Sequence, residues 1–142
     1  MHVQFALDKC GDGDDTLISI KLVTPDKVFV SEVFVNEDVL RNLEHFLDKY
    51  FVKRSFKTSM FQMGVFSVDY AGGATTIRLS KNSDDDQVVV GISMASEEEK
   101  MASLVRDFVF HTSDDLSLDF LKQIRSVNSG HEKVAKWELF KV

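Results

Sequence analysis

The sequence predicts a single α+β domain in which two amphipathic helices pack on a mostly antiparallel sheet of about seven to nine strands. Three observations lead to this fold class. Runs of alternating apolar and polar residues dominate the chain, only two stretches have helical periodicity, and the strand-like runs come in blocks. Because no linker or repeat divides the 142 residues, we assign residues 1–142 to one domain.

The centre of the predicted sheet is an antiparallel meander from Val65 to His111. Four strand-like runs follow one another there, separated by turn-forming or acidic residues. They are Val65–Tyr70, Thr75–Ser80, Gln87–Met94 and Ala102–His111. The pair Gly72-Gly73 favours a hairpin between the first two runs, because glycine accepts the positive φ of tight turns.

The segment that follows the third run of the meander allows two interpretations. Glu97–Glu99 suit the first turn of a helix, so a helix over residues 97–108 is one of them. Residues 103–111, however, are rich in strand-favouring types, among them Val105 and Phe108. We therefore favour a strand for residues 103–111.

Three further strands are predicted before the meander. They are Met1–Leu7, Thr16–Val23 and Val28–Val35. The second and third flank Thr24-Pro25-Asp26-Lys27, where proline provides the fixed φ of a tight turn. These two strands are therefore predicted to form a hairpin.

The first helix is predicted to begin after Asn36, whose side chain would act as its N-cap. Apolar residues recur at three- and four-residue intervals from Val39 to Phe51, and charged residues fall largely on the opposite face. After this helix, Phe56–Met63 fits neither period well, and we assign it a short strand.

A second amphipathic helix and a last strand complete the chain. The apolar stripe Leu116–Val127 follows Ser113 or Asp114, either of which can cap a helix, and it ends at Asn128-Ser129-Gly130. Val134–Val142 then alternates as a strand. An ordered strand at this position is predicted to join the sheet.

Composition restricts the location and the partners of the protein. Seventeen basic and 23 acidic residues give a net charge of −6, which opposes binding to nucleic acid or an anionic membrane and favours a basic partner. Aromatic residues within Lys49–Lys57 would suit nucleic-acid contact, but Tyr50 and Phe51 belong to the helix stripe. The chain has neither a secretory signal pattern nor a membrane-length apolar run, so we expect a cytoplasmic protein.

No residue pattern in the sequence predicts catalysis, a cofactor or a metal site. The histidines at positions 2, 45, 111 and 131 are dispersed and match no metal-ligand spacing. Cys10 is the only cysteine, which excludes an intramolecular disulfide, and no histidine lies near it in a nucleophile pattern. We therefore expect a protein that is not an enzyme and needs no cofactor.

Acidic residues concentrate in the predicted loops and caps, most densely in two triplets. The residues that we predict to contact a partner are Asp84, Asp85, Asp86, Glu97, Glu98 and Glu99. Charged loop tips can also serve solubility alone, whereas an electrostatic docking surface would accelerate and orient association with a basic protein. Successive turns of a meander alternate between the ends of a sheet, so the two triplets should lie at opposite ends.

The order and pattern of the elements resemble small cytoplasmic immunity proteins encoded beside bacterial polymorphic or contact-dependent toxins. Three segments carry the likeness together with the meander: Thr24-Pro25-Asp26-Lys27, the helix Val39–Leu47 and the segment Phe108–Leu121. Such proteins bind one toxin domain, often a nuclease, and block its substrate surface. The resemblance implies a cognate toxin whose basic face meets the acidic loops.

Two other function classes stay open at the level of the sequence. A small enzyme or ligand-binding domain could use an aromatic pocket made from phenylalanines together with Tyr50, Tyr70 or Trp137. A structural or oligomerising subunit could use an exposed sheet edge. The sequence leaves the oligomeric state and the identity of the toxin undetermined.

Overall fold

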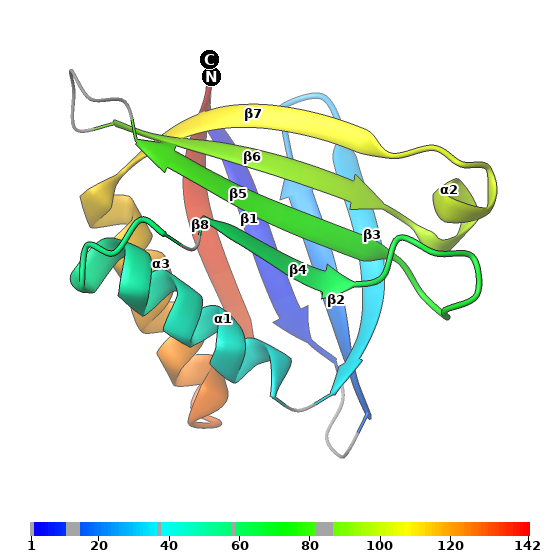
Figure 1. The fold of residues 1–142 in the computed structure, drawn as a ribbon, viewed down its shortest axis with the longest axis horizontal. Coiled ribbons are helices and arrows are strands. Elements are labelled where there is room, and N and C mark those ends of the chain that lie inside the picture. The colour runs from blue at the N-terminus through cyan, green and yellow to red at the C-terminus, as the bar shows by residue number, and fades with distance from the viewer. Residues whose placement is uncertain (1, 11–14, 37, 58, 82–86) are drawn as a thin grey trace.

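The structure, a computed structural model, describes residues 2–10, 15–36, 38–57, 59–81 and 87–142. It is an α+β fold with one eight-stranded antiparallel sheet in the order β3-β2-β1-β8-β7-β6-β5-β4 (Figure 1). The strands are β1 (His2–Lys9), β2 (Asp15–Val23), β3 (Val28–Asn36), β4 (Met60–Gly64), β5 (Ala74–Lys81), β6 (Gln87–Ala95), β7 (Arg106–Ser113) and β8 (Val134–Lys141). The predicted fold class is confirmed.

The helices α1 (Val39–Leu47), which continues as the π-helical turn η1 (Asp48–Val52), and α3 (Asp114–Asn128) lie together on one side of the curved sheet (Figure 1). The short α2 (Glu97–Met101) lies apart from them, at the end of β6. The apolar stripe predicted from Val39 to Phe51 is the buried face of α1 and η1, and the stripe of α3 is buried in the same way. Both helices therefore pack through the face that their periodicity indicated.

The core lies between the helices and the inner face of the sheet. Trp137 of β8 is fully buried and stacks on Phe120 of α3 at 4.9 Å between ring centroids. Its indole Nε1 donates to Ser117 Oγ at 3.2 Å, so the polar atom of the ring is satisfied inside the core. Phe5 of β1 meets both rings edge-on. This cluster joins α3 to the middle of the sheet.

Two helix caps were predicted, and the structure confirms the one at Ser113 and contradicts the one at Asn36. Ser113 Oγ accepts from Leu116 N at 3.1 Å and caps α3, as one of the two alternatives proposed. Asn36 Oδ1 accepts from Asp38 N at 3.1 Å, but α1 begins only at Val39. Asn36 therefore binds the amide that precedes the helix, and its predicted role as the N-cap is wrong.

The prediction that Val65–Tyr70 forms the first strand of the meander is wrong. Val65–Tyr70 forms bends and a turn, and the strand that pairs with β5 is β4, which begins and ends earlier in the chain. Gly64 has φ of +75° and ends β4, because β-structure does not continue through a positive φ. Gly72-Gly73 consequently belongs to a longer loop, residues 65–73, and does not form a tight hairpin turn.

The segment from residue 97 to residue 111, for which a helix and a strand were the two interpretations, contains one of each. Glu97–Met101 is the helix α2, and the strand β7 begins at Arg106 instead of residue 103. A helix cannot extend from residue 97 to residue 108, because Ser103 has φ of +55° between the two elements. The remaining strands β5, β6 and β7 form the antiparallel meander that was predicted.

The two edge strands of the sheet approach each other because the sheet is strongly curved. Gly73 N donates to Glu32 O at 2.7 Å, and Ser31 Oγ of β3 donates to Ala95 O at the end of β6 at 2.8 Å. A Cβ at Gly73 would lie 2.2 Å from Ser31 Oγ and 2.5 Å from Ala95 O, so only glycine fits. We call this junction of Ser31, Glu32, Gly73 and Ala95 the seam.

We predict that Ser31→Ala weakens the seam. Ser31 is fully buried, and its loss leaves the Ala95 carbonyl without the hydroxyl donor. The free energy of unfolding should fall by about 1–3 kcal/mol, the usual effect of leaving a buried polar group unpaired. Urea unfolding measures this. Ser80→Ala, an exposed serine on β5, is the matched control and should change stability by less than about 0.5 kcal/mol.

Candidate partner-binding groove

The short helix α2 is held in place at its first residue by a reciprocal cap. Ser96 Oγ accepts from Glu99 N at 3.1 Å, and Glu99 Oε1 accepts from Ser96 N at 3.0 Å. This capping box satisfies two amides that the helix itself cannot satisfy. The local sequence Ser96-Glu97-Glu98-Glu99 therefore determines where α2 begins and directs Glu99 back towards the protein.

Glu99 also joins α2 to the neighbouring strands through Arg106. Arg106 Nε lies 2.5 Å from Glu99 Oε2, and the Arg106 guanidinium lies 5.3 Å from the ring centroid of Phe29 on β3. Phe29 in turn contacts Phe108 of β7. The position of α2 relative to β3 is therefore set by a chain of contacts from Glu99 through Arg106 to Phe29.

These contacts change the acidity of Glu99. Partial burial raises its pKa, but hydrogen bonds from Ser96 and Arg106 and the positive charge of Arg106 lower it by more, so the pKa lies below its ordinary value of 4.5. Glu99 is consequently charged at neutral pH and neutralised by its own chain. Of the three predicted contact residues that the structure describes, Glu97, Glu98 and Glu99, it is Glu99 whose side chain binds other groups of the protein.

Lys100 is an internally satisfied cation on the same helix. Its side chain is buried with a relative exposure of 6%, and Nζ donates to Val65 O at 2.9 Å and to Tyr70 O at 3.0 Å. The two carbonyls belong to the loop 65–73, so Lys100 fastens this loop to α2. A buried ammonium requires such hydrogen bonds to offset its loss of hydration.

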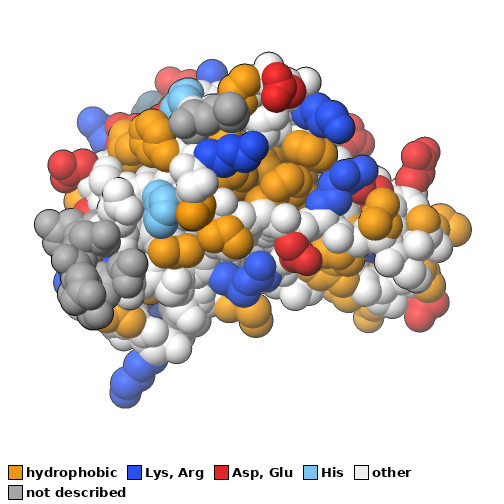
Figure 2. Space-filling model, turned by 90° about the horizontal axis from the view of Figure 1, so that it is seen from above, with side chains coloured by type: hydrophobic (Ala, Val, Ile, Leu, Met, Phe, Trp, Pro, Cys, Tyr) orange, Lys and Arg blue, Asp and Glu red, His pale blue; other side chains and the backbone are white. Residues whose placement is uncertain are grey.

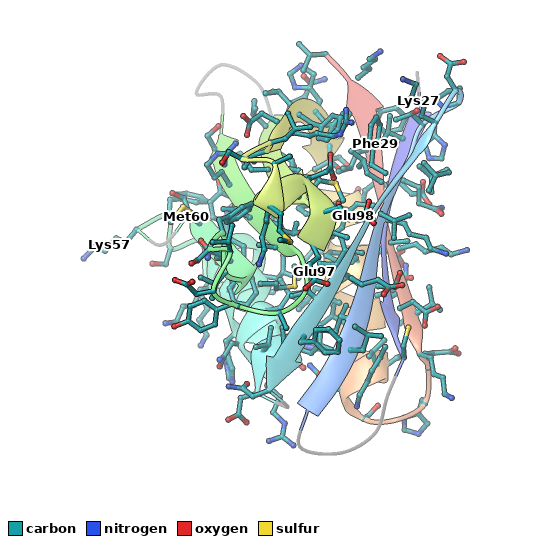
Figure 3. All side chains as sticks on the ribbon, turned by 90° about the vertical axis from the view of Figure 1, so that its right-hand side faces the viewer. Lys27, Phe29, Lys57, Met60, Glu97 and Glu98 are labelled. Atoms are coloured by element: carbon teal, nitrogen blue, oxygen red, sulfur yellow. The ribbon has the colours of Figure 1, made fainter. Side chains whose placement is uncertain are left out.

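Between β3, the loop 65–73 and α2 lies a groove with a volume of about 300 Å³. Its lining residues are Val30, Glu32, Phe34, Gly72, Ser96, Glu97 and Glu98. Val30, Glu32 and Phe34 follow one another on the outward face of β3. Figure 3 shows Glu97 and Glu98 on the side of α2 that faces β3. We call this feature the β3–α2 groove.

The carboxylates of the groove differ from Glu99 because no internal cation neutralises them. Within the described ranges, Glu32, Glu97 and Glu98 take part in no salt bridge and no side-chain hydrogen bond. Two cations of adjoining segments are already bound elsewhere, Lys100 to loop carbonyls and Arg106 to Glu99. The groove therefore carries concentrated negative charge that a partner could neutralise.

Exposed apolar side chains belong to the same segments that border the groove. Phe34 on β3 is 53% exposed, Tyr70 in the loop is 59% exposed, and Met101 at the end of α2 is 72% exposed. Val68 of the loop adds further exposed apolar surface, and Leu104, which follows α2 in the chain, is also exposed. Large exposed apolar groups beside charged ones are typical of protein-binding sites.

The face of the molecule in Figure 2 carries mixed charge, with acidic side chains lying among basic and apolar ones. At the end of β5 that is far from the groove, Asp114 is bound by Lys81 at 3.1 Å and by Arg54 at 3.2 Å. Beside them, burial raises the pKa of Tyr50, Arg54 lowers it and Asp114 raises it, with a net rise. Asp114, like Glu99, is therefore neutralised by cations of the protein itself.

The six residues predicted to contact a partner fall into three groups. Glu97 and Glu98 line the groove, Glu99 is bound internally, and Asp84–Asp86 lie outside the described residues. The strand ends that flank the latter triplet, Lys81 and Gln87, are at the opposite end of β5 and β6 from Ala74 and Ala95.

Glu32 is a groove residue that the sequence prediction did not include. The alternation of Val28–Val35 did indicate that Glu32 shares a face with apolar residues of β3, but it gave no sign that α2 lies beside them. Of the aromatic residues proposed for a ligand pocket, Tyr50 and Trp137 are buried in the core, where both contact Phe51, whereas Tyr70 is exposed.

Among the described residues, no group of three or more His, Cys, Asp or Glu side chains is arranged to hold a metal ion. In the same part of the chain, every helix is too short or too polar to cross a membrane.

Comparisons of the sequence with protein-family models and with curated proteins gave no match.

We predict that Glu99→Gln reduces stability in a pH-dependent manner. Because the pKa of Glu99 is lowered in the folded state, its charge stabilises the protein above about pH 4.5, and this contribution is lost as the pH falls through the lower folded value. The variant should melt at a lower temperature than the parent near pH 7, and the difference should shrink towards pH 3. Thermal unfolding followed by circular dichroism measures both.

The glutamine variant retains the capping geometry, because glutamine also serves at this position of a capping box. The matched control is Glu97→Gln, whose side chain is exposed and has no partner among the described residues. A constant stability difference between Glu99→Gln and the parent across this pH range would contradict an electrostatic role for Glu99.

Proposed function

We propose that this protein is a non-enzymatic immunity protein that binds a cognate toxin domain and neutralises it in the bacterial cytoplasm. The observation that carries the proposal is the β3–α2 groove, which is lined by the apolar residues Val30 and Phe34 and by three carboxylates that have no side-chain partner among the described residues. The resemblance in element order to immunity proteins points to the same class of function.

The groove suits a basic side chain of a partner protein. The aliphatic stem of a lysine or arginine can pack on Val30 and Phe34 while its charged end meets Glu32, Glu97 and Glu98. A toxin that acts on nucleic acid must present such side chains on its substrate face, because they neutralise phosphates. An immunity protein bound to that face of the toxin would block the access of nucleic acid to it.

The charge of the groove is expected to act mainly on the rate of association. Unpaired charges on an exposed rim steer a partner of opposite charge towards the site and orient it, and this effect falls as salt is added. The apolar residues around the groove would then limit dissociation. The triplet Asp84–Asp86 is a second proposed contact, and it is tested separately because its flanking strand ends lie at the other end of the sheet.

The test uses the product of the reading frame adjacent to the gene of this protein as the toxin. Co-expression of the native protein should restore growth of cells that make this toxin. In the double variant Glu97→Lys and Glu98→Lys, the association rate measured by surface plasmon resonance at low salt should fall by about tenfold or more, and its salt dependence should weaken.

A variant with Asp119→Lys and Glu132→Lys serves as the matched control, because it makes the same change in net charge at exposed sites on α3 and before β8. It should protect cells and bind like the native protein. The triple Asp84–Asp86 variant is compared with both. Full protection by the Glu97 and Glu98 variant, with an unchanged association rate, would refute the groove as the contact.

A further inference from the structure

The strand β3 has a backbone edge that is open over part of its length. It is an edge strand of the sheet, and its one strand neighbour among the described residues is β2. On its other edge, Gly73 N binds Glu32 O, and Gly72 lies close to Phe34. The loop 65–73 therefore covers the second half of β3. The first half, around Val28 and Val30, is not covered by it.

The hydrogen-bond register shows which backbone groups face this edge. In an antiparallel ladder, the N–H and C=O of one residue point to the same side, and successive residues alternate. Because Glu32 O points away from β2 towards Gly73, the backbone groups of Val30 and Val28 also point away from β2. Across the described ranges, no backbone group binds them on that side.

The two faces beside this open edge differ in chemistry. On the outer face lie the acidic groove residues Glu32, Glu97 and Glu98. On the inner face lie the partly buried rings of Phe29 and Phe108, with Arg106 over Phe29. Figure 3 shows Phe29 and Glu98 at the opening between β3 and α2. A chain entering there meets acids on one side and aromatic rings on the other.

We propose that the partner adds an extended segment to the edge of β3 at Val28–Val30, with basic and apolar side chains in alternation. Side chains of a strand alternate between faces, so basic ones would meet the groove carboxylates and apolar ones would meet Phe29 and Phe108. This inference rests on the proposed function and specifies how the partner binds.

Charge argues against a second copy of this chain as the occupant. Pairing two β3 edges would bring two sets of the same unpaired carboxylates together, and each copy carries a net charge of −6. Like charges at an interface oppose association. A basic strand from another protein has no such conflict, and its backbone would satisfy the open groups of Val28 and Val30.

The experiment uses a capped peptide of alternating lysine and valine as the probe, observed by amide NMR of the labelled protein. The parent peptide should shift the amide signals of Val28, Val30 and Glu32 and slow hydrogen exchange at Val28 and Val30. The same peptide N-methylated at all of its central residues keeps its charge but cannot form the ladder, and it should bind about tenfold more weakly or not at all.

Two protein variants test the same edge. Val30→Pro removes the outward N–H, a change that an edge strand tolerates, whereas Val30→Thr keeps it. Val30→Pro should weaken binding of the parent peptide about tenfold, and Val30→Thr should not. Circular dichroism establishes that both variants are folded. If Val30→Pro proves unfolded, the comparison of the two peptides on the native protein decides alone.

The outcomes separate this inference from the proposed function. Equal binding of both peptides, lost in the Glu97→Lys and Glu98→Lys variant, would overturn strand addition and leave electrostatic docking at the groove intact. Binding that is insensitive to this double variant would count against the groove itself. Absence of shifts at Val28 and Val30, or protection of these amides in a peptide-free dimer, would overturn strand addition regardless of the growth assay.

Discussion

The seam between β3 and the ends of β5 and β6 is the constraint on which the other features of this structure depend. It consists of the Gly73 amide on the Glu32 carbonyl, the Ser31 hydroxyl on the Ala95 carbonyl, and a glycine where no side chain fits. Because the seam closes the curved sheet near the middle of β3, it brings α2 beside that strand. The β3–α2 groove exists only as a consequence of this closure.

The charges near the groove are divided between those that build the site and those that are free to bind. Arg106 and Lys100 are held by Glu99 and by loop carbonyls, so the local cations position α2 and the loop 65–73. Glu32, Glu97 and Glu98 have no such internal role among the described residues. Consecutive glutamates in one short helix therefore have different surroundings, which follow from the direction in which the helix points each side chain.

Local patterns explain most of what the sequence predicted correctly. The apolar spacing of α1 and α3, the alternation of β2, β5, β6 and β8 and the cap at Ser113 each depend on residues close together in the chain. The errors have a different origin. Val65–Tyr70 alternates like a strand, but Gly64 ends β4 before it, and Lys100, thirty or more residues further on, binds its carbonyls. A sequence pattern contains no sign of such a distant partner.

The sequence by itself determined the fold class, the two long helices and the acidic character of the protein. Propensity, periodicity and charge are properties of neighbouring residues, and they suffice for these conclusions. Only the tertiary structure decided that Glu99 is neutralised by Arg106, that Glu32 joins Glu97 and Glu98, and that β3 keeps an open edge at Val28 and Val30. Arg106 reaches Glu99 through the turn between α2 and β7, whereas Glu32 meets Glu97 and Glu98 because the curved sheet brings together residues far apart in the chain.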